Sequence, residues 1–318
     1  MNLAVKNLDL EGTTIVRTRD EARHVVSVLR QYPERIAAWD TETIGIDPKI
    51  DSPVGKGQVI CASAFLGPDV DFGSGPRLLI DNFADAEGTL MEFKEYFEDP
   101  NYLKCWHNYG YDRHILYNHG IDCRGFGGDT MHMARLFDPS LIPGSYSLES
   151  QSELLQGEIE ETKSEMISHL REQGSKPQLA CLDIYERVFR KTTKINVKET
   201  FGFYKQLKNG ETGKILMFPD IEEMHTDARY VEKWIEYSCF DAEITYFLRE
   251  TLARKLCQLE TREEDMQNLL DLYAKYWLPF GEVLTDMERN GIAVDVSYLQ
   301  QIQLKAERDK KNYEESFL

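Results

Sequence analysis

Apolar and polar positions over the first 130 residues predict short strands that alternate with helices. Residues 15–30 indicate a short strand followed by a helix that starts near Asp20. The segment 58–67 (QVICASAFLG) is almost wholly apolar, which is typical of a central strand. Further strands are predicted over 35–42, 77–81 and 104–108. The pattern therefore predicts a sheet of five strands.

Helical patterns follow these strands and continue through the second half of the chain. The longest covers 232–256, and Asp129 is the expected N-cap of a helix over 130–137. Other helices are predicted over 89–98, 110–119 and 146–155. Such an order favours an α/β fold in which helices cover both faces of a mixed sheet.

Two further regions stand apart from this pattern. The span 157–225 is polar and charge-rich, and we interpret it as an insertion of helices and loops. The last segment, 260–318, is helical and acidic, with expected breaks at Pro279 and Gly291. We therefore expect a main domain over 1–256 and a helical extension over 257–318.

The composition is that of a globular protein. With 318 residues and 42% hydrophobic content, the chain can form one large core. It contains no run of 18 apolar residues, so no membrane contact is expected. Its first residues (MNLAVKNLDLEGTT) lack the pattern of a secretory signal or an organellar transit peptide. The six cysteines lack zinc-site spacing, which indicates buried, reduced thiols.

The net charge of −18 is unusual for a protein that binds nucleic acid, because phosphate contacts call for a basic surface. Acidic side chains can, however, be gathered to bind Mg²⁺. The charge is also uneven, since residues 183–214 contain eight basic and four acidic side chains and carry a net +4. Its basic part, residues 187–214, is either a track for a nucleic-acid backbone or a solvated surface insertion.

Two carboxylates end the strand predicted over 35–42. In the run Asp40-Thr41-Glu42 the acids are two residues apart, so in a strand both point to the same face. Such a pair can chelate a hard cation, although acids at strand ends also occur without one.

Two further acids fall in helical patterns. Asp112 lies early in the helix that follows Asn108, where the helix dipole favours an acid and Asn108 suits a cap. Tyr237 and Asp241 are spaced i and i+4, so they share one face of the long helix. An acid on this largely apolar helix needs a partner such as a metal ion, unless it lies at the solvent edge.

Together these motifs resemble the DEDD superfamily of exonucleases, and the Tyr four residues before the last Asp resembles its DEDDy branch. The surroundings AAWDTETIGIDP, CWHNYGYDRHILYNHGI, GDTMHMARLFDPS and GSYSLES resemble the proofreading domain of family A DNA polymerases. Residues 197–215 are similar to plant and protist organellar members. Residues 276–299 resemble the segment that leads to a polymerase thumb.

The resemblance implies an RNase H-like fold and phosphodiester hydrolysis with two Mg²⁺ ions, or Mn²⁺. It implies that Asp40 bridges both ions, that Glu42 and Asp241 complete the first site, and that Asp112 supports the second through water. It assigns Tyr237 to orienting the attacking water. Glu236 stands where the other DEDD branch has a histidine. The substrate-binding residues that it suggests, together with the basic segment, are Thr41, Ile46, Asn108, Lys191, Lys194 and Lys198.

The expected function is removal of nucleotides from single-stranded or frayed DNA 3′ ends. The resemblance implies proofreading during organellar DNA replication, in a mitochondrion or plastid, alongside a polymerase domain of the same protein. One alternative is a nuclease that trims RNA 3′ ends, because DEDDy sites also act on RNA. Another is a non-catalytic module that binds DNA or docks a partner.

Overall fold

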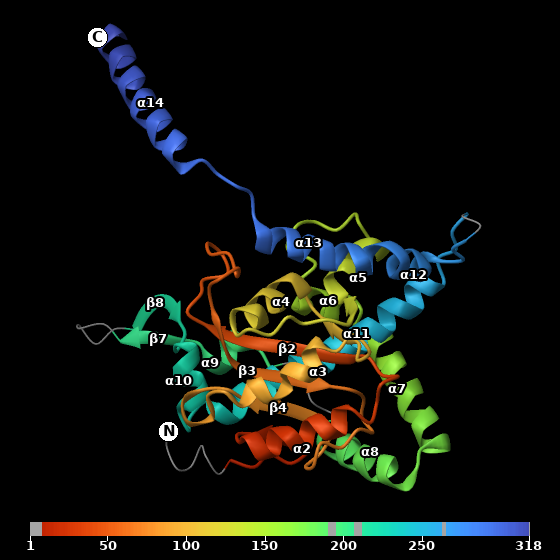
Figure 1. Ribbon diagram of the computed structural model, residues 1–318. Helices are drawn as coiled ribbons and strands as arrows, with labels where there is room; N and C mark the ends of the chain where they lie inside the picture. Colours follow the sequence, from red (N-terminus) through yellow and green to blue (C-terminus); the bar gives the residue numbers. More distant parts are fainter. Residues whose placement is uncertain (1–7, 190–194, 207–211, 263–264, 318) are drawn as a thin grey trace. The chain divides into compact units, whose positions relative to one another are not determined.

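The computed structural model describes residues 8–189, 195–206, 212–262 and 265–317. Within these ranges six strands form a mixed sheet in the order β1-β4-β3-β2-β5-β6 (Figure 1). Its strands are β1 (Thr13–Val16), β2 (Ala37–Ile44), β3 (Gln58–Phe65), β4 (Arg77–Asp81), β5 (Lys104–Trp106) and β6 (Phe126–Asp129). Central β2 runs antiparallel to β3 and parallel to β5. The sheet lies in the first of two compact units, Met1–Thr285 and Asp286–Leu318.

The expected strand count was one too low, because β6 has little strand character in its sequence. It reads Phe126-Gly127-Gly128-Asp129, with two glycines and one apolar side chain. Packing explains the first glycine, since a Cβ at Gly127 would lie 2.9 Å from the Cβ of Leu103. The close approach of neighbouring chain thus favours glycine over a typical strand residue here.

Helices cover both faces of the sheet, as predicted. In the first half they are α2 (Arg19–Leu29), α3 (Lys94–Glu98), α4 (Tyr109–Asn118), α5 (Thr130–Phe137) and α6 (Leu148–Leu154), with 3-10 turns η1 (Ala84–Ala86) and η2 (Thr89–Phe93). One face packs Trp39 and Val59 against Leu29, Phe97 and Ile115 of α2, α3 and α4. The long helix α11 (Val231–Cys257) covers the other face through Ile235 and Cys239, which meet Ile60 and Leu79.

Local capping refines two helix starts. Helix α2 begins earlier than Asp20, because Thr18 and Glu21 form a capping box around its first turn. Helix α5 begins as predicted, with the Asp129 carboxylate accepting from the backbone N–H of Met131. All six cysteines are free, and five are buried. The prediction of buried thiols is wrong for Cys257, which is exposed at the end of α11.

The described parts of the polar span 157–225 are folded onto the domain. They contain α7 (Gln156–Gln173), α8 (Lys176–Phe189), α9 (Val197–Phe201), the strands β7 (Phe203–Gln206) and β8 (Thr212–Met217), and α10 (Ile221–Thr226). The antiparallel pair β7-β8 was not expected. Tyr185 of α8 is fully buried, and its hydroxyl donates to Glu243 of α11 at 2.6 Å. This buried contact ties the insertion to the long helix.

The last helices are α12 (Leu269–Leu272), the π turn η3 (Tyr273–Trp277), α13 (Leu278–Asn290) and α14 (Val296–Phe317). The predicted break at Pro279 is wrong, because helix continues from α12 through η3 into α13. A π turn directly precedes this proline, and its wider ring accommodates a residue that an α turn would reject. The break at Gly291 is confirmed, with a φ of 64°.

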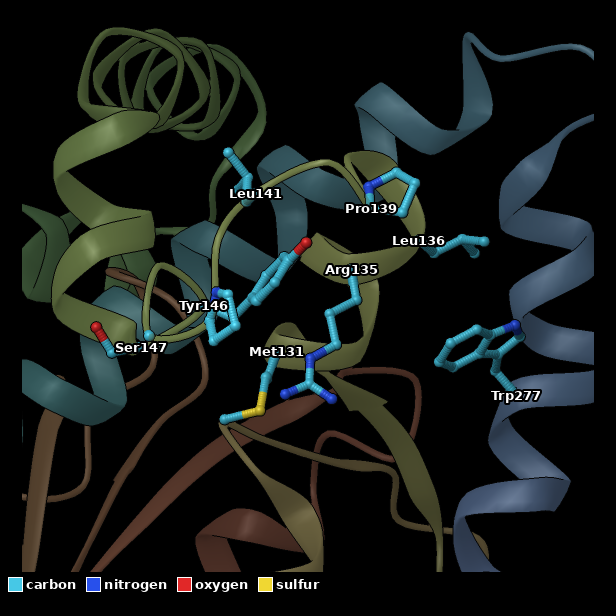
Figure 2. Close-up of a pocket in the computed structure, with 10 residues that line it drawn as sticks. Met131, Arg135, Leu136, Pro139, Leu141, Tyr146, Ser147 and Trp277 are labelled. Carbon is cyan, nitrogen blue, oxygen red and sulfur yellow. The ribbon is translucent and has the colours of Figure 1, made fainter.

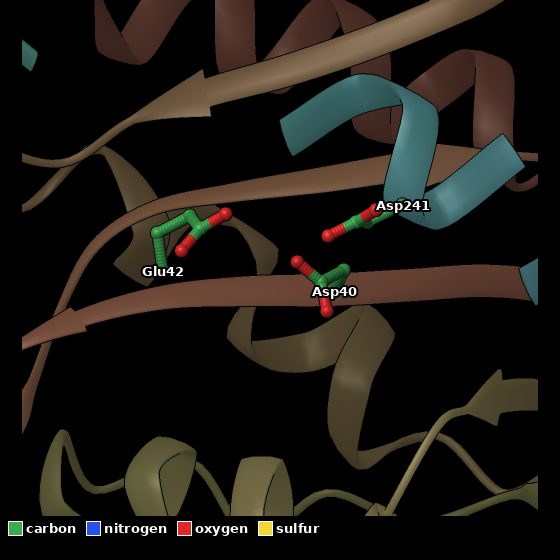
Figure 3. A group of neighbouring side chains, drawn as sticks. All are labelled: Asp40, Glu42 and Asp241. Atoms are coloured by element: carbon green, nitrogen blue, oxygen red, sulfur yellow. The ribbon is translucent and has the colours of Figure 1, made fainter. Parts of the chain in front are cut away.

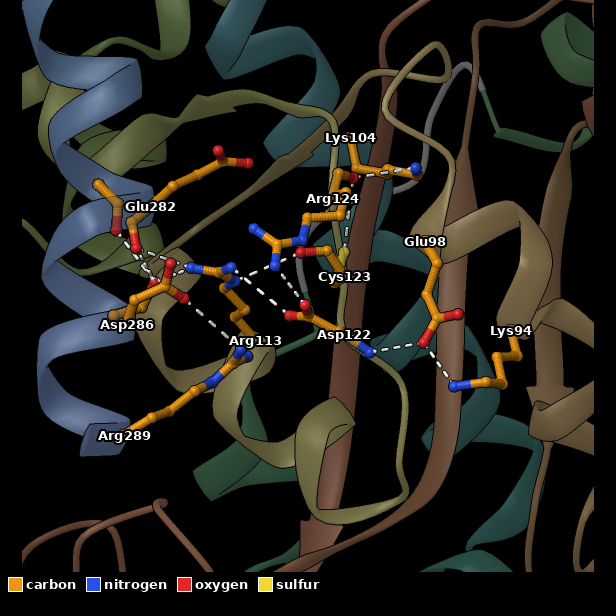
Figure 4. Close-up of polar contacts among 12 residues, drawn as sticks. Lys94, Glu98, Lys104, Arg113, Asp122, Cys123, Arg124, Glu282, Asp286 and Arg289 are labelled. Atoms are coloured by element: carbon orange, nitrogen blue, oxygen red, sulfur yellow. Dashed lines mark hydrogen bonds and ion pairs between the residues drawn. The ribbon is translucent and has the colours of Figure 1, made fainter.

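A buried arginine fastens α13 to α4. Arg113 is fully buried, and its guanidinium donates to the carbonyl of Glu282 at 2.8 Å and to the hydroxyl of Thr285 (Figure 4). It also donates to the carbonyl of Cys123 at 3.3 Å. Since Arg113 follows Asp112 directly, these contacts also fix the helix that holds one of the predicted metal ligands.

Candidate active site

Three of the predicted acids converge between β2 and α11. Asp40 and Glu42 are two residues apart on β2, so both side chains lie on the face of the sheet that α11 covers. Asp241 of α11 faces them there (Figure 3). One carboxylate oxygen from each lies within 4.8 Å of the other two. Each of the three residues is half-buried. Three oxygen ligands at this spacing suit a hard divalent cation.

The negative charges in this cluster repel one another. Burial raises the pKa of Asp40 to about 7. Burial also raises the pKa of Glu42 well above its ordinary value, and the charges of Asp40 and Asp241 raise it further. Carboxylates that share a site without a compensating cation hold protons in this way. A bound cation would reverse the effect and keep all three ionised.

Asp112 adjoins the cluster from α4 but lies outside the group of three. Its side chain is buried, and its Oδ1 accepts a hydrogen bond from the Thr41 hydroxyl at 2.6 Å. Burial raises the pKa of Asp112 well above its ordinary value, and the charge of Asp40 contributes to that rise. The Thr41 hydroxyl, predicted to bind substrate, is thus engaged with an acid of the site.

Tyr237 lies one helical turn before Asp241 on α11. The charge of Asp241 raises the pKa of the Tyr237 hydroxyl above its ordinary value, and burial adds to the rise. The ring packs beside Trp234, with 5.8 Å between their centroids. The phenol is therefore protonated at neutral pH and can donate a hydrogen bond near the carboxylates.

An interior carboxylate sets the start of α4. Asn108 precedes this helix in a left-handed conformation, with φ 70°, and its side chain makes no capping bond. Asp129, at the end of β6, caps the helix instead. Its fully buried carboxylate accepts from four backbone N–H groups, those of Asn108 (3.1 Å), Tyr109 (2.8 Å), Met131 (2.8 Å) and His132 (3.3 Å). One acid thus caps both α4 and α5, and only the second role was predicted.

Ser238 is a further residue of the site that the sequence analysis missed. Its hydroxyl lies 3.2 Å from Oε1 of Glu42 and 3.0 Å from the carbonyl of Trp234. The carbonyl of Ser238 in turn accepts from the hydroxyl of Ser63 on β3 at 2.7 Å. These bonds fix α11 against the sheet and orient Glu42. A serine inside an apolar helix, directly after Tyr237, was the available sign.

The remaining predicted substrate residues have different surroundings. Ile46 is partly buried and packs against the core. Lys198 lines a cavity of about 350 Å³ together with Tyr237 and Asp241. Lys191 and Lys194 lie outside the described residues, so their placement stays a prediction.

A larger cavity of about 760 Å³ lies away from the predicted catalytic side chains. It is mainly apolar and is lined by residues of α5, the loop after it and η3, including Arg135, Tyr146 and Trp277 (Figure 2). None of the five predicted catalytic residues lines it. It shares Ser147 with the smaller cavity, so the two adjoin. Of these two cavities, the smaller one reaches Asp241 and Tyr237.

An α/β sheet whose central strand presents carboxylates to a helix-borne acid is typical of nucleases with an RNase H-like fold. Residues 13–181, more than half of the chain, match the family model described as 3′-5′ exonuclease, that of family A DNA polymerases. The chain belongs to this 3′-5′ exonuclease family.

Similar proteins agree with this family. The chain is 36% identical over 297 residues to "DNA polymerase I A, chloroplastic/mitochondrial" of Arabidopsis thaliana, covering 90% of this chain and 26% of that protein. It is also 36% identical to "DNA polymerase I A, chloroplastic" of Oryza sativa subsp. japonica over 93% of this chain and 27% of that protein. The chain thus spans about a quarter of the length of the curated relatives it matches.

A solved structure supports the fold. The "POL domain of Pol1 from M. smegmatis complex with DNA primer-template and dNTP" aligns with a TM-score of 0.54 at 14% identity, over 92% of this chain and 35% of that one. In the part of the chain that the structure describes, no helix combines the length and the apolar character needed to cross a bilayer.

Proposed function

We propose that this chain is a divalent-metal-dependent 3′→5′ exodeoxyribonuclease that acts on single-stranded or frayed DNA ends. The observation that supports this most is the convergence of Asp40, Glu42 and Asp241 beside the protonated hydroxyl of Tyr237. DNA is the proposed substrate because the family is that of DNA polymerases and the relatives are named as such.

The residues present fit a pair of Mg²⁺ or Mn²⁺ ions. All the ligands are oxygens, and the pKa values of Asp40, Glu42 and Asp112 are raised, which marks negative charge that a cation would stabilise. Asp40, Glu42 and Asp241 would hold one ion, and Asp112 would support the second through water. Bound Mg²⁺ would supply positive charge to the scissile phosphate and to the leaving 3′ oxygen.

The protein's own groups do the positioning. The Tyr237 hydroxyl donates to, and so orients, the water that attacks the terminal phosphodiester. The cavity that contains Tyr237, Asp241 and Lys198 receives the last nucleotide, and the Lys198 ammonium favours its phosphate. Ile46, Thr41 and Asn108 remain proposed contacts to the substrate, as do Lys191 and Lys194.

We infer the biological role from the names of the similar proteins. We infer that residues 1–256 form an exonuclease domain and that 257–318 connect it to a polymerase domain, so that the exonuclease proofreads newly made DNA. Relatives named as chloroplastic or mitochondrial support an organellar location. The alternatives, an RNA-trimming nuclease and a non-catalytic module, are separated from this proposal by one assay.

That assay follows a 5′-labelled single-stranded oligonucleotide, as DNA and as RNA of the same sequence, with Mg²⁺ or with EDTA. The wild-type chain should shorten the DNA from its 3′ end, and both EDTA and Asp112→Ala should abolish the ladder. Faster cleavage of the RNA would favour the trimming nuclease. A folded wild-type chain that cleaves neither strand would overturn the enzymatic proposal.

A further inference from the structure

Three buried polar side chains form a row that joins β4, α10 and α11. Asp81 ends β4, His225 lies in the short helix α10, and Trp234 lies near the start of α11. None of the three is more than 4% exposed. Nε2 of His225 lies 3.0 Å from Oδ1 of Asp81, and the indole N–H of Trp234 donates to Nδ1 of His225 at 3.2 Å. The result is one continuous hydrogen-bonded row, Asp81–His225–Trp234.

The donors and acceptors of this row are arranged in one way. An indole N–H can only donate, so Nδ1 of His225 accepts and the proton of the neutral imidazole is on Nε2. Nε2 then donates to the Asp81 carboxylate, which also accepts from the backbone N–H of Phe83 at 3.0 Å. A buried row in which each group is paired makes its side chains rigid, so this row fixes the orientation of the Trp234 ring.

The ring of Trp234 contacts two parts of the candidate site. Its centroid lies 5.8 Å from that of Tyr237, with 31° between the ring planes. It also lies 6.2 Å from the ring centroid of Phe201, in an edge-to-face arrangement. Phe201 ends α9, the helix whose Lys198 lines the smaller cavity with Tyr237 and Asp241. The orientation of one indole therefore affects both the proposed water-orienting tyrosine and the helix that carries the lysine.

Stability alone does not favour a polar row in this place. The surroundings of Trp234 include the apolar side chains of Met224 and Ile221. A carboxylate and an imidazole lose hydration when they are buried, so apolar side chains of similar volume often stabilise such a place equally well. Apolar side chains cannot, however, make a directional contact with the indole N–H. The row therefore suits a position where the angle of one ring matters.

We propose that His225 is a positioning residue for the exonuclease site, because it holds the Trp234 ring and, through that ring, the Tyr237 hydroxyl in the orientation that the attacking water requires. His225 acts through Trp234 and is not itself a catalytic residue. A group misplaced by about 1 Å at a reacting centre can slow a reaction by as much as about 10²-fold. This inference rests on the proposed exonuclease function.

The first test measures kcat and KM for single-stranded DNA together with Mn²⁺ affinity. His225→Leu removes both bonds of the row at similar volume, so kcat should fall about tenfold while KM and Mn²⁺ affinity stay within about twofold of wild type. His225→Asn keeps an oxygen acceptor near the place of Nδ1, so it should restore kcat to within about threefold. The matched control is Tyr185→Phe, which removes another buried hydrogen bond to α11 and should leave kcat unchanged.

A double-variant cycle shows whether the effect passes through Tyr237. If the row acts on the Tyr237 hydroxyl, Tyr237→Phe removes what His225 contributes, so adding His225→Leu to it should lower kcat by less than about twofold. A further tenfold fall in that background would overturn the inference, and so would a loss of Mn²⁺ affinity large enough to explain the lower kcat. If His225→Leu does not fold, Trp234→Phe removes the same bond from its other end and should show the same coupling.

Fluorine NMR keeps this inference distinct from the proposed function. The full chain is labelled with 5-fluorotryptophan, and Trp234→Phe identifies the Trp234 resonance among those of the four tryptophans. We expect one sharp Trp234 resonance in the wild type and in His225→Asn, and a shifted and broadened one in His225→Leu. This change without any cleavage by the wild-type chain would overturn the nuclease and retain His225 as the residue that orients Trp234. Cleavage with an unchanged Trp234 resonance in His225→Leu would overturn the inference and retain the nuclease.

Discussion

Helix α11 places two acids only two residues apart in opposite electrostatic surroundings. Glu243 is buried with Arg77, whose Nε and Nη2 lie 2.7 and 2.6 Å from one carboxylate oxygen. The other oxygen accepts from the hydroxyl of Tyr185 and lies 3.5 Å from the ammonium of Lys163. Burial alone would raise the pKa of Glu243, but these cations outweigh it and hold the pKa below its ordinary value.

Asp241 turns to the other side and meets Asp40 and Glu42, where like charges raise the pKa of Glu42. The fold therefore neutralises the structural acid with its own cations, whereas a bound ion would balance the negative charges of the proposed catalytic group. Burial acts on both kinds of acid, so the charges of their neighbours distinguish the structural Glu243 from the proposed catalytic carboxylates.

The largest effect expected is on catalysis at Asp241. Asp241→Asn should slow single-strand cleavage by about 10³-fold or more, because a lost metal ligand removes several kcal/mol of transition-state stabilisation. In EDTA its melting temperature should equal or exceed that of wild type, since one repelling charge is gone. Rates on a labelled oligonucleotide and thermal unfolding by circular dichroism measure the two. Glu34→Gln, at an exposed acid, is the control, and near-normal cleavage by Asp241→Asn would contradict the comparison.

The reverse pattern is expected at Glu243. Glu243→Gln leaves the buried guanidinium of Arg77 without its ion pair, so the free energy of unfolding should fall by about 3–5 kcal/mol. Cleavage per folded molecule should stay within threefold of wild type. Denaturant titration measures the loss, and the double variant Arg77→Met with Glu243→Gln should recover most of it. A loss of less than about 1 kcal/mol would show that the pair is not needed.

Metal and pH sharpen the same contrast at Asp40. Mg²⁺ at about 100 times its Kd should stabilise the wild-type chain by about 2.7 kcal/mol, and should not stabilise Asp40→Asn to that extent. In EDTA the pKa of Asp40 is about 7, above the value of about 3.9 in an unfolded chain. The folded state therefore binds a proton at Asp40 more tightly than the unfolded chain does. This contribution to stability is complete below pH ~4 and is lost as pH rises through about 7.

Thermal unfolding at about pH 5, 6, 7 and 8, with EDTA and with Mg²⁺, measures this dependence. Asp40→Asn should flatten the metal-free fall between pH 5 and 8 relative to wild type. Identical pH profiles for the two proteins would contradict the assigned role of burial at Asp40.

A smaller effect is expected at Ser238, whose hydroxyl contacts Glu42. Ser238→Ala removes the hydroxyl that orients this carboxylate, so Mg²⁺ affinity should fall by about tenfold, as for other groups that hold a metal ligand in place. Mn²⁺ titration followed by electron paramagnetic resonance measures affinity without catalysis. Ser238→Thr keeps a hydroxyl and should restore most of it. Unchanged Mn²⁺ affinity in Ser238→Ala would show that the Ser238 hydroxyl does not orient Glu42 for metal binding.

Much of the fold could be predicted because hydrophobic patterning determines it directly. The apolar run over 58–67 and the helical pattern over 232–256 became β3 and α11 with boundaries close to those expected. Strand β6 was missed, because Gly127 is favoured by a close contact with Leu103 that no local pattern encodes. The helix through Pro279 was missed for a similar reason, since a π turn has no simple sequence pattern.

The site divides in the same way. Spacing alone placed Asp40 beside Glu42 and Tyr237 beside Asp241, because strand and helix periodicities fix which side chains share a face. The resemblance, and not the spacing, predicted that these two pairs meet where β2 packs against α11. The role of Ser238 depends on the packing of a helix against a sheet, which a single sequence does not reveal.

Asp129 shows how a substitution outside the predicted metal ligands could disturb the site. Its carboxylate accepts four backbone N–H groups from the starts of two helices, whereas an asparagine offers a single oxygen acceptor. A natural Asp129→Asn allele would keep every acid of the catalytic centre and still displace the helix that holds Asp112. Surveys that judge an exonuclease gene intact by its metal ligands would score such an allele as functional, although the helix that carries the proposed ligand Asp112 has lost part of its cap.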